Sequence, residues 1–161
     1  MLLDLRDIIE RPGGRVPFSF ELDGQALCCG SVTGFAEPPR AEGAVRNCAG
    51  VLLLEGRLHA DMLCRCDRCG VAFSRVYDEA VSAVLADTDD NPDAYLLEDD
   101  CADLSEIFRT VFILSMDSKF LCREDCKGLC PTCGKNLNDG PCACTRSCDP
   151  RMAVLEQLLD K

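Results

Sequence analysis

The sequence contains very little histidine and lacks the common motifs of hydrolytic enzymes. His59 is the single histidine among 161 residues, and neither G-x-S-x-G nor H-E-x-x-H occurs. Hydrolytic sites need a base beside a nucleophile or a metal in a recognisable arrangement, so these absences argue against a hydrolase. His59 falls on the polar side of an alternating segment, where we expect a surface residue rather than a ligand.

Long apolar runs are also missing. No stretch approaches the roughly 18 consecutive apolar residues that a membrane span needs. The first residues, Met1 to Asp7, are interrupted by charges and do not resemble a signal peptide. These features predict a cytoplasmic protein with no membrane partner, whose cysteines are kept reduced.

Basic residues are scarce. The chain has 17 Lys and Arg against 28 Asp and Glu, a formal net charge of −11. Because contacts to phosphate need Lys and Arg, RNA binding should be confined to a local patch or should run through a basic protein partner. Residues 87–100 contain no Lys or Arg at all. That segment is interpreted as a solvated acidic loop, with docking of a basic partner as the alternative.

Cysteine, by contrast, is abundant, with 14 residues in the chain. Cys130 and Cys133 form a C-P-T-C-G knuckle in which Gly134 can adopt a positive φ. Cys142 and Cys144 can bring a second pair of sulfurs to the same point. Four sulfurs in tetrahedral geometry form a closed, structural site whose default occupant is Zn²⁺, although an iron–sulfur cluster can use the same ligands.

Two further cysteine pairs suggest a second site. Cys66 and Cys69 form a C-x-x-C turn after an alternating segment, and Cys122 and Cys126 follow a predicted helix that could return to the same end of the sheet. We therefore expect one or two zinc ions per chain. A competing arrangement combines Cys126 with Cys130, Cys133 and one of the last pair. Cys148 could also substitute as a ligand.

The remaining cysteines are expected to be small buried hydrophobes or free thiols; they are Cys28, Cys29, Cys48, Cys64 and Cys101. A thiol redox function using Cys66 and Cys69 is the alternative from another class. Redox pairs lie at a helix N-terminus, where the thiol pKa is lowered. Here the pair lies between two predicted antiparallel strands, which argues against that function.

Apolar alternation predicts most of the sheet. Residues 16–22 alternate as a strand, and the dipeptide Asp23-Gly24 predicts a hairpin to a returning strand at 25–35, with a loop at 37–43. Residues 51–64 show the clearest pattern. Gly56 within it predicts a bulge or a break into two strands. Residues 71–85 predict a further strand, and the first ten residues suit a short helix or an opening strand.

Two segments have helical periodicity. Asp103 resembles an N-cap, and it is followed by an apolar stripe made of Leu104, Ile107, Phe108, Val111 and Phe112. Near the C-terminus, Asp149 and Pro150 begin a second such pattern that carries Val154, Leu155, Leu158 and Leu159.

Together these elements predict an α+β fold. It consists of an antiparallel sheet or partly closed barrel, one packed helix, and a Cys-rich zinc-binding tail that ends in a short helix. The predicted division is a β domain at 1–118 and the tail at 119–161. The tail has few large apolar residues, so metal should decide whether it folds.

The cysteine motifs resemble those of the bacterial YceD family. The resemblance is carried by the C-K-G-L-C-P-T-C-G run from Cys126 to Gly134, by Cys142-Ala143-Cys144, by the D-P-R-M segment from Asp149, and by Cys66-Asp67-Arg68-Cys69. It spans the chain from about residue 50 onward. Some family members lack the knuckle-rich tail but keep the C-x-R-C turn and a cysteine near Cys126, which implies a site that joins the two.

The resemblance also implies a function. It indicates a non-enzymatic, cytoplasmic factor in large ribosomal subunit assembly and 23S rRNA accumulation. Its partner would be the large-subunit rRNA precursor or a basic ribosomal protein, with no small-molecule substrate. Lys127, Lys135, Arg146 and Arg151 are the candidate partner-binding residues, and Lys119 and Arg123 add to the basic charge of this region.

Overall fold

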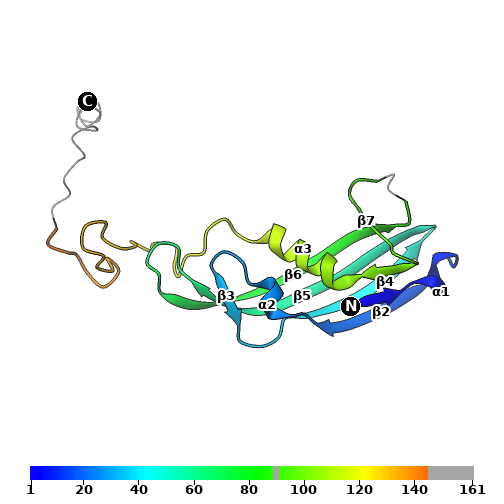
Figure 1. The fold of residues 1–161 in the computed structure, drawn as a ribbon, viewed down its shortest axis with the longest axis horizontal. Coiled ribbons are helices and arrows are strands. Elements are labelled where there is room, and N and C mark those ends of the chain that lie inside the picture. Colours follow the sequence, from blue (N-terminus) through cyan, green and yellow to red (C-terminus); the bar gives the residue numbers. More distant parts are fainter. Residues whose placement is uncertain (89–90, 145–161) are drawn as a thin grey trace, which may run out of the picture.

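The protein is a curled, mostly antiparallel sheet with few helices and a cysteine-rich segment at one end (Figure 1), which confirms the α+β prediction. The computed structural model describes residues 1–88 and 91–144. Its elements are β1 Leu2–Asp4, α1 Arg6–Ile9, β2 Arg15–Glu21, α2 Gly24–Leu27, β3 Val32–Phe35, β4 Arg40–Cys48, β5 Val51–Arg65, β6 Ala72–Ala86, β7 Ala94–Leu96, β8 Cys101–Asp103 and α3 Leu104–Ser115.

The sheet is built around the long hairpin of β5 and β6. Its strand order is β2-β4-β5-β6-β7, and β3 pairs with the far end of β5. All pairings are antiparallel except that of β6 with β7. A separate two-stranded ribbon joins β1 to β8. The β5–β6 hairpin places its turn, residues 66–71, at the end of the sheet nearest the cysteine-rich segment (Figure 1).

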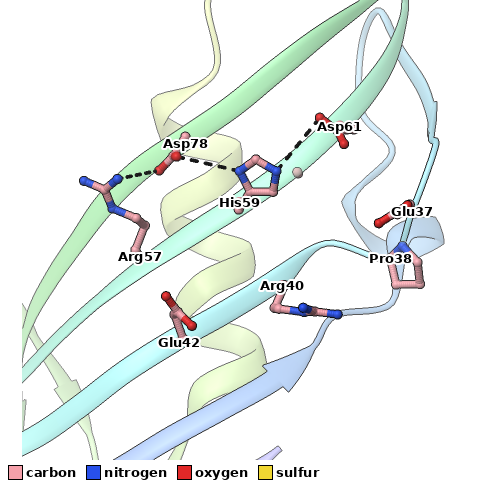
Figure 2. Close-up of a pocket in the computed structure, with 9 residues that line it drawn as sticks. Glu37, Pro38, Arg40, Glu42, Arg57, His59, Asp61 and Asp78 are labelled. Atoms are coloured by element: carbon pink, nitrogen blue, oxygen red, sulfur yellow. Dashed lines mark ion pairs between the residues drawn. The ribbon is translucent and has the colours of Figure 1, made fainter.

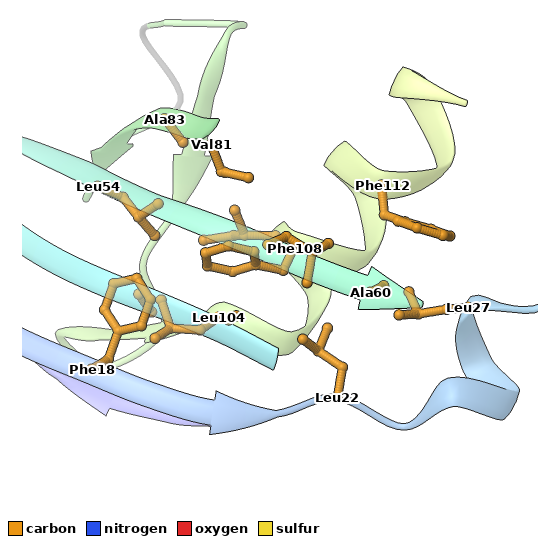
Figure 3. Packing of buried hydrophobic residues seen from close by; sticks show 14 of the residues in the cluster. Phe18, Leu22, Leu27, Leu54, Ala60, Val81, Ala83, Leu104, Phe108 and Phe112 are labelled. Atoms are coloured by element: carbon orange, nitrogen blue, oxygen red, sulfur yellow. The ribbon is translucent and has the colours of Figure 1, made fainter. Parts of the chain in front are cut away.

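The core lies between one face of the sheet and α3 (Figure 3). The alternation predicted over residues 51–64 is confirmed by burial of one side of β5, which comprises Leu52, Leu54, Leu58, Ala60, Met62 and Cys64. The side chain of Asp103 caps α3, as predicted, by accepting hydrogen bonds from the backbone N–H groups of Ser105 and Glu106. Phe108 and Phe112 are fully buried, and Phe112 packs edge-on against Tyr77 with ring centroids 5.0 Å apart.

The prediction of a bulge or break at Gly56 is wrong. β5 continues through this residue in unbroken register, with Gly56 opposite Gly43 of β4 and Val81 of β6. A Cβ on Gly56 would lie 3.0 Å from the Phe108 ring and 3.1 Å from the Phe18 ring. Glycine is therefore needed because aromatic rings cross the sheet closely at this point, not because the strand bends.

The hairpin predicted at Asp23-Gly24 is also wrong. The Asp23 side chain accepts a hydrogen bond from the backbone N–H of Gln25 and caps the short helix α2. The predicted returning strand at 25–35 shrinks to β3, which pairs with β5 instead of β2. The true partner of β2 is β4, which begins inside the predicted 37–43 loop. The same dipeptide suits a turn or a helix cap, and here the cap is the one formed.

The acidic segment is partly ordered by pairing. It contributes β7 and leads into β8, and its side chains at Asp87, Asp93, Glu98, Asp99 and Asp100 are exposed. The first ten residues contain both a strand and a helix, β1 and α1. In the part of the chain that the structure describes, no helix is both long enough and apolar enough to cross a membrane. The predicted helix at 149–159 lies outside the described residues, and the 118/119 domain boundary stays a prediction.

Candidate metal centre

The structure gathers eight cysteines into two groups of four. The first group, called the sheet-end group, contains Cys66, Cys69, Cys122 and Cys126. The second group, called the tail group, contains Cys130, Cys133, Cys142 and Cys144. In each group the sulfur atoms all lie within 4.8 Å of one another. Cys126 therefore lies in the sheet-end group, and the competing arrangement that placed it with Cys130 and Cys133 is not adopted.

Both groups begin with the same local turn. In the sheet-end group the backbone N–H of Gly70 donates to the carbonyl oxygen of Cys66 at 2.8 Å. The backbone N–H of Cys66 donates to the carbonyl oxygen of Val71 at 2.9 Å. In the tail group the backbone N–H of Gly134 donates to the carbonyl oxygen of Cys130 at 2.9 Å, and the backbone N–H of Cys130 donates to the carbonyl oxygen of Lys135 at 2.8 Å.

The two turns also share their glycine conformation, with φ of +71° at Gly70 and +72° at Gly134. Neither glycine has a neighbour that a Cβ would meet, so the left-handed backbone conformation alone calls for glycine there. A C-x-x-C-G sequence thus folds identically at two places in the chain, and in both it points two sulfurs at one spot.

Asp67, inside the first turn, holds the segment that brings the second pair of the sheet-end group. Its carboxylate accepts a hydrogen bond from the backbone N–H of Phe120 at 2.6 Å, and its own N–H donates to the Phe120 carbonyl at 2.8 Å. The hydroxyl of Ser31 donates to the other carboxylate oxygen. Asp67 thereby joins the chain after α3 to the turn. The point of contact is Phe120, two residues before Cys122.

Arg68 performs the equivalent role for Cys126. Its guanidinium donates to the backbone carbonyl of Cys126 at 2.8 Å. The backbone of Arg68 also lies close to Gly128, where a Cβ would come within 3.1 Å of the Arg68 carbonyl. The two residues between the first cysteines therefore position the last two, which gives the D-R sequence of this turn a physical reason.

Asn138 connects the two groups. It lies between Cys133 and Cys142, yet its side-chain amide N–H donates to the sulfur of Cys126 at 3.4 Å. Its side-chain oxygen accepts a hydrogen bond from the backbone N–H of Lys127 at 2.8 Å. The loop of the tail group thus supports a sulfur of the sheet-end group.

Electrostatics within the groups favours partial ionisation. Burial opposes ionisation of Cys66, but backbone hydrogen bonds from Cys122, Cys69 and Arg68 outweigh it and lower the pKa to about 6. Backbone hydrogen bonds from Cys133 and Thr132 lower the pKa of Cys130 to about 6. Backbone hydrogen bonds therefore favour the first sulfur of each group as thiolate, the form that binds a cation; at Cys66 they come from Cys122 as well as from the turn.

In the second cysteine pair of each group, one thiol has a raised pKa instead. Burial, followed by the neighbouring sulfurs, raises the pKa of Cys122 to about 12. The neighbouring sulfur of Cys133 is the largest of the causes that raise the pKa of Cys144 to about 12. Thiols that repel one another's charge in this way are stabilised as thiolates once a dication lies among them. The donor set therefore fits a metal ion.

The other sequence-predicted residues are scattered. Lys127 and Lys135 are exposed beside the two groups, and the Lys135 ammonium donates to the Pro141 carbonyl at 2.9 Å. Arg146, Arg151 and Cys148 lie outside the described residues. Cys64 is buried, Cys28 and Cys48 are exposed thiols, and Cys29 and Cys101 are intermediate. The roles of Asp67 and Asn138 were missed, because no spacing rule marks either residue.

His59 is on the surface, as predicted, in a polar hollow of about 350 Å³ on the sheet (Figure 2). Its ring nitrogens lie 3.7 Å from a carboxylate oxygen of Asp78 and 3.9 Å from one of Asp61. Asp78 also pairs with Arg57 at 3.1 Å. These exposed polar side chains contact one another, and the hollow adds nothing to the cysteine groups.

Fold and site together define a cysteine-rich α+β protein whose sheet end and tail each carry a four-sulfur group that could hold a metal ion. A comparison with models of known protein families places the chain in a narrower group than this class. Residues 54–159 match the model of the YceD family, described as large ribosomal RNA subunit accumulation protein YceD, and the chain belongs to this family. The match includes all eight grouped cysteines. Comparisons with curated proteins and with solved structures gave no match.

Proposed function

We propose that this protein is a non-enzymatic, cytoplasmic factor in large ribosomal subunit assembly that promotes accumulation of 23S rRNA by binding. The observation that carries the proposal is the family match across residues 54–159, whose description names large ribosomal RNA accumulation. The two four-sulfur groups support a non-enzymatic role. A metal ion bound by four cysteines stabilises the local fold and has no open position for a substrate.

Zinc is the proposed occupant of both groups. The Zn–S bond is about 2.3 Å, so two sulfurs at the corners of a tetrahedron around zinc lie about 3.8 Å apart. The Cys66–Cys126 and Cys69–Cys122 sulfur pairs are separated by 3.7 Å and 3.6 Å. Iron–sulfur clusters place the cysteine sulfurs bound to different irons farther apart. All four sulfurs of each group lie within 4.8 Å of one another, and this spacing favours a single ion. The zinc would hold the tail in place rather than take part in a reaction.

The charge distribution supports two kinds of ribosomal partner. The exposed carboxylates of Asp87, Asp93, Glu98, Asp99 and Asp100 suit a basic ribosomal protein. They lie in a chain with a net charge of −11. Lys127 and Lys135 beside the cysteine groups suit rRNA, and Arg146 and Arg151 are the other proposed contacts. The rRNA-binding surface would be made of the cysteine-rich end of the molecule.

The test is to deplete the protein from cells and to follow rRNA. We expect the ratio of large-subunit to small-subunit rRNA to fall, and tagged protein to sediment with large-subunit precursors at low salt. A complementing copy carrying Cys66→Ser and Cys130→Ser should fail to restore the ratio, whereas one carrying Cys48→Ser, an exposed cysteine outside both groups, should restore it. An unchanged rRNA ratio after depletion would contradict the proposal.

The geometry argues against the redox alternative at Cys66 and Cys69. The pair lies in a turn between antiparallel strands, and its sulfurs lie against those of Cys122 and Cys126. Alkylation with and without a chelator separates the two functions. Ligand sulfurs become reactive only after the metal is removed, whereas a redox thiol reacts with metal present.

A further inference from the structure

A cleft beside the sheet-end group is lined by more basic than acidic side chains, in a chain whose net charge is −11. It measures about 410 Å³ and lies where the segment after α3 runs beside the start of β6. Three basic side chains line it, Arg75, Lys119 and Arg123, against a single acidic one, Glu124. Four further hollows in the described residues are each lined by more acidic than basic side chains.

The basic groups of this cleft are available to an anion. Arg75 and Arg123 are 46% and 47% exposed, and their partners Asp117 and Asp125 are exposed as well. Exposed surface ion pairs of this kind contribute little to stability, so a phosphate can replace the carboxylate. Lys119 is exposed and forms no direct ion pair within the described part of the chain.

The cleft also has an apolar floor. Phe73 and Leu121 line it, and both are partly buried against the sheet-end cysteines. The Arg75 guanidinium lies 5.7 Å from the centre of the Phe120 ring, which holds this cation at the cleft. Aromatic and aliphatic surface between cationic groups is the composition that binds single-stranded nucleic acid, since bases stack while phosphates pair with the rim.

We propose that this cleft binds the phosphate backbone of single-stranded RNA, with Arg75, Lys119 and Arg123 as phosphate contacts and Phe73 as a base platform. The inference rests on the proposed function and adds an RNA contact next to the sheet-end group to those proposed at Lys127 and Lys135. Metal binding would fix the cleft, because Cys122 lies between Leu121 and Arg123.

The test is binding of a short fluorescent single-stranded RNA to the full chain purified with zinc, over a series of salt concentrations. Each phosphate contact on a single strand contributes about 0.7 to the slope of log K against log salt. Lys119→Ala combined with Arg123→Ala should therefore reduce the slope by about 1.4 and the affinity by roughly 10- to 30-fold near 0.1 M salt. Circular dichroism and zinc content establish that the variant is folded.

The matched control removes the same charge elsewhere. Arg15→Ala combined with Arg40→Ala changes two exposed arginines on β2 and β4, and its affinity and slope should equal those of the unmodified chain. Equal binding by the cleft variant and this control would overturn the proposal.

A loss of affinity with Lys127→Ala and Lys135→Ala but not with the cleft variant would also overturn it, while leaving the proposed function intact. Preference of the cleft for an acidic peptide over RNA would overturn it too. The depletion experiment tests the proposed function separately, because it does not depend on which surface touches RNA.

Discussion

At the residue scale, side chains that are not ligands decide where the ligands meet. Asp67 and Arg68 bind backbone groups of Phe120 and Cys126, and Asn138 donates to the Cys126 sulfur. This hydrogen bond from Asn138 is the largest cause of the lowered pKa of Cys126. Groups that hydrogen-bond to metal ligands fix their orientation and charge, so such residues tune affinity without touching the metal.

Replacing Asn138 by alanine should therefore weaken metal binding at the sheet-end group. We expect a loss of about 10- to 100-fold in affinity for one of the two ions, the usual effect of removing a hydrogen bond to a ligand. Competition with a chromophoric chelator measures it. Asn91→Ala, which changes an exposed asparagine in the 87–100 segment, should leave both affinities unchanged. If the Asn138 variant bound both ions as tightly as the unmodified chain, the hydrogen bond would have no role in metal binding.

The close approach at Gly56 gives a second prediction at this scale. Gly56→Ala places a Cβ 2.8 Å from the Glu42 carbonyl oxygen and against two aromatic rings. Overpacking of this kind costs about 1–3 kcal/mol in the free energy of unfolding. Gly34→Ala is the control, because its nearest neighbour would be 3.9 Å away. Chemical denaturation measures both, and equal stability would contradict the close packing described for β4 and β5.

At the scale of elements, α3 determines both the core and the site. Its buried face contributes Leu104, Ile107, Phe108 and Phe112, while Leu114 is 79% exposed near its end. The chain leaves α3 at Ser115 and reaches Phe120, which is held by Asp67. The helix therefore fixes the point from which Cys122 and Cys126 approach the β5–β6 turn.

Phe112→Ala should destabilise the folded chain by about 3–5 kcal/mol, because the ring is fully buried and its removal leaves a cavity. Leu114→Ala should change the stability by no more than about 0.5 kcal/mol, as expected of an exposed side chain. Thermal or urea unfolding of the zinc-loaded chain separates the two. Similar losses for both variants would mean that the orientation of α3 is wrong.

The elements that could be predicted from sequence are those set by local patterns. The alternation of β5, the cap and stripe of α3, and both C-x-x-C-G turns each occupy a short window whose signal agrees with the final structure. β4 could not be predicted, since its run of Ala41, Gly43, Ala44 and Asn47 has little alternation of large apolar residues. Its place depends on the rings of Phe18 and Phe108 packing over Gly43 and Gly56, a non-local contact.

The same limit applies to the site. The cysteine pairs were visible as spacings, and their grouping into fours depends on chain distances that only the fold supplies. Asn138 is twelve residues from Cys126, and no motif relates the two. Asp23-Gly24 shows the converse case, in which a strong local signal suits two structures and tertiary packing selects the one that sequence reasoning did not choose.

At the scale of the whole molecule, the sheet and the cysteine-rich end are stabilised differently. The main apolar cluster joins the sheet and α3 and contains none of the eight grouped cysteines. The second cluster consists of Cys66, Cys69 and Cys126, packed against Phe73, Leu121 and Cys122. So little apolar burial cannot hold the segment, whereas structural zinc contributes about 10–16 kcal/mol in small finger peptides.

Chelation should therefore unfold residues 119–144 and leave the sheet folded. Amide hydrogen exchange with and without chelator measures this directly. We expect loss of protection at Cys130, Gly134 and Leu137, whose N–H groups donate within the tail, and retained protection along β5 and β6. Uniform loss of protection over the whole chain would mean that the two parts form one cooperative unit.

The most direct measurement is the metal content of the full chain, purified without chelator, together with the oxidation state of its cysteines. We expect two zinc ions per chain, with all eight grouped sulfurs shielded from alkylation until the metal is removed. One ion or none per chain, or disulfide bonds among the grouped cysteines, would contradict it.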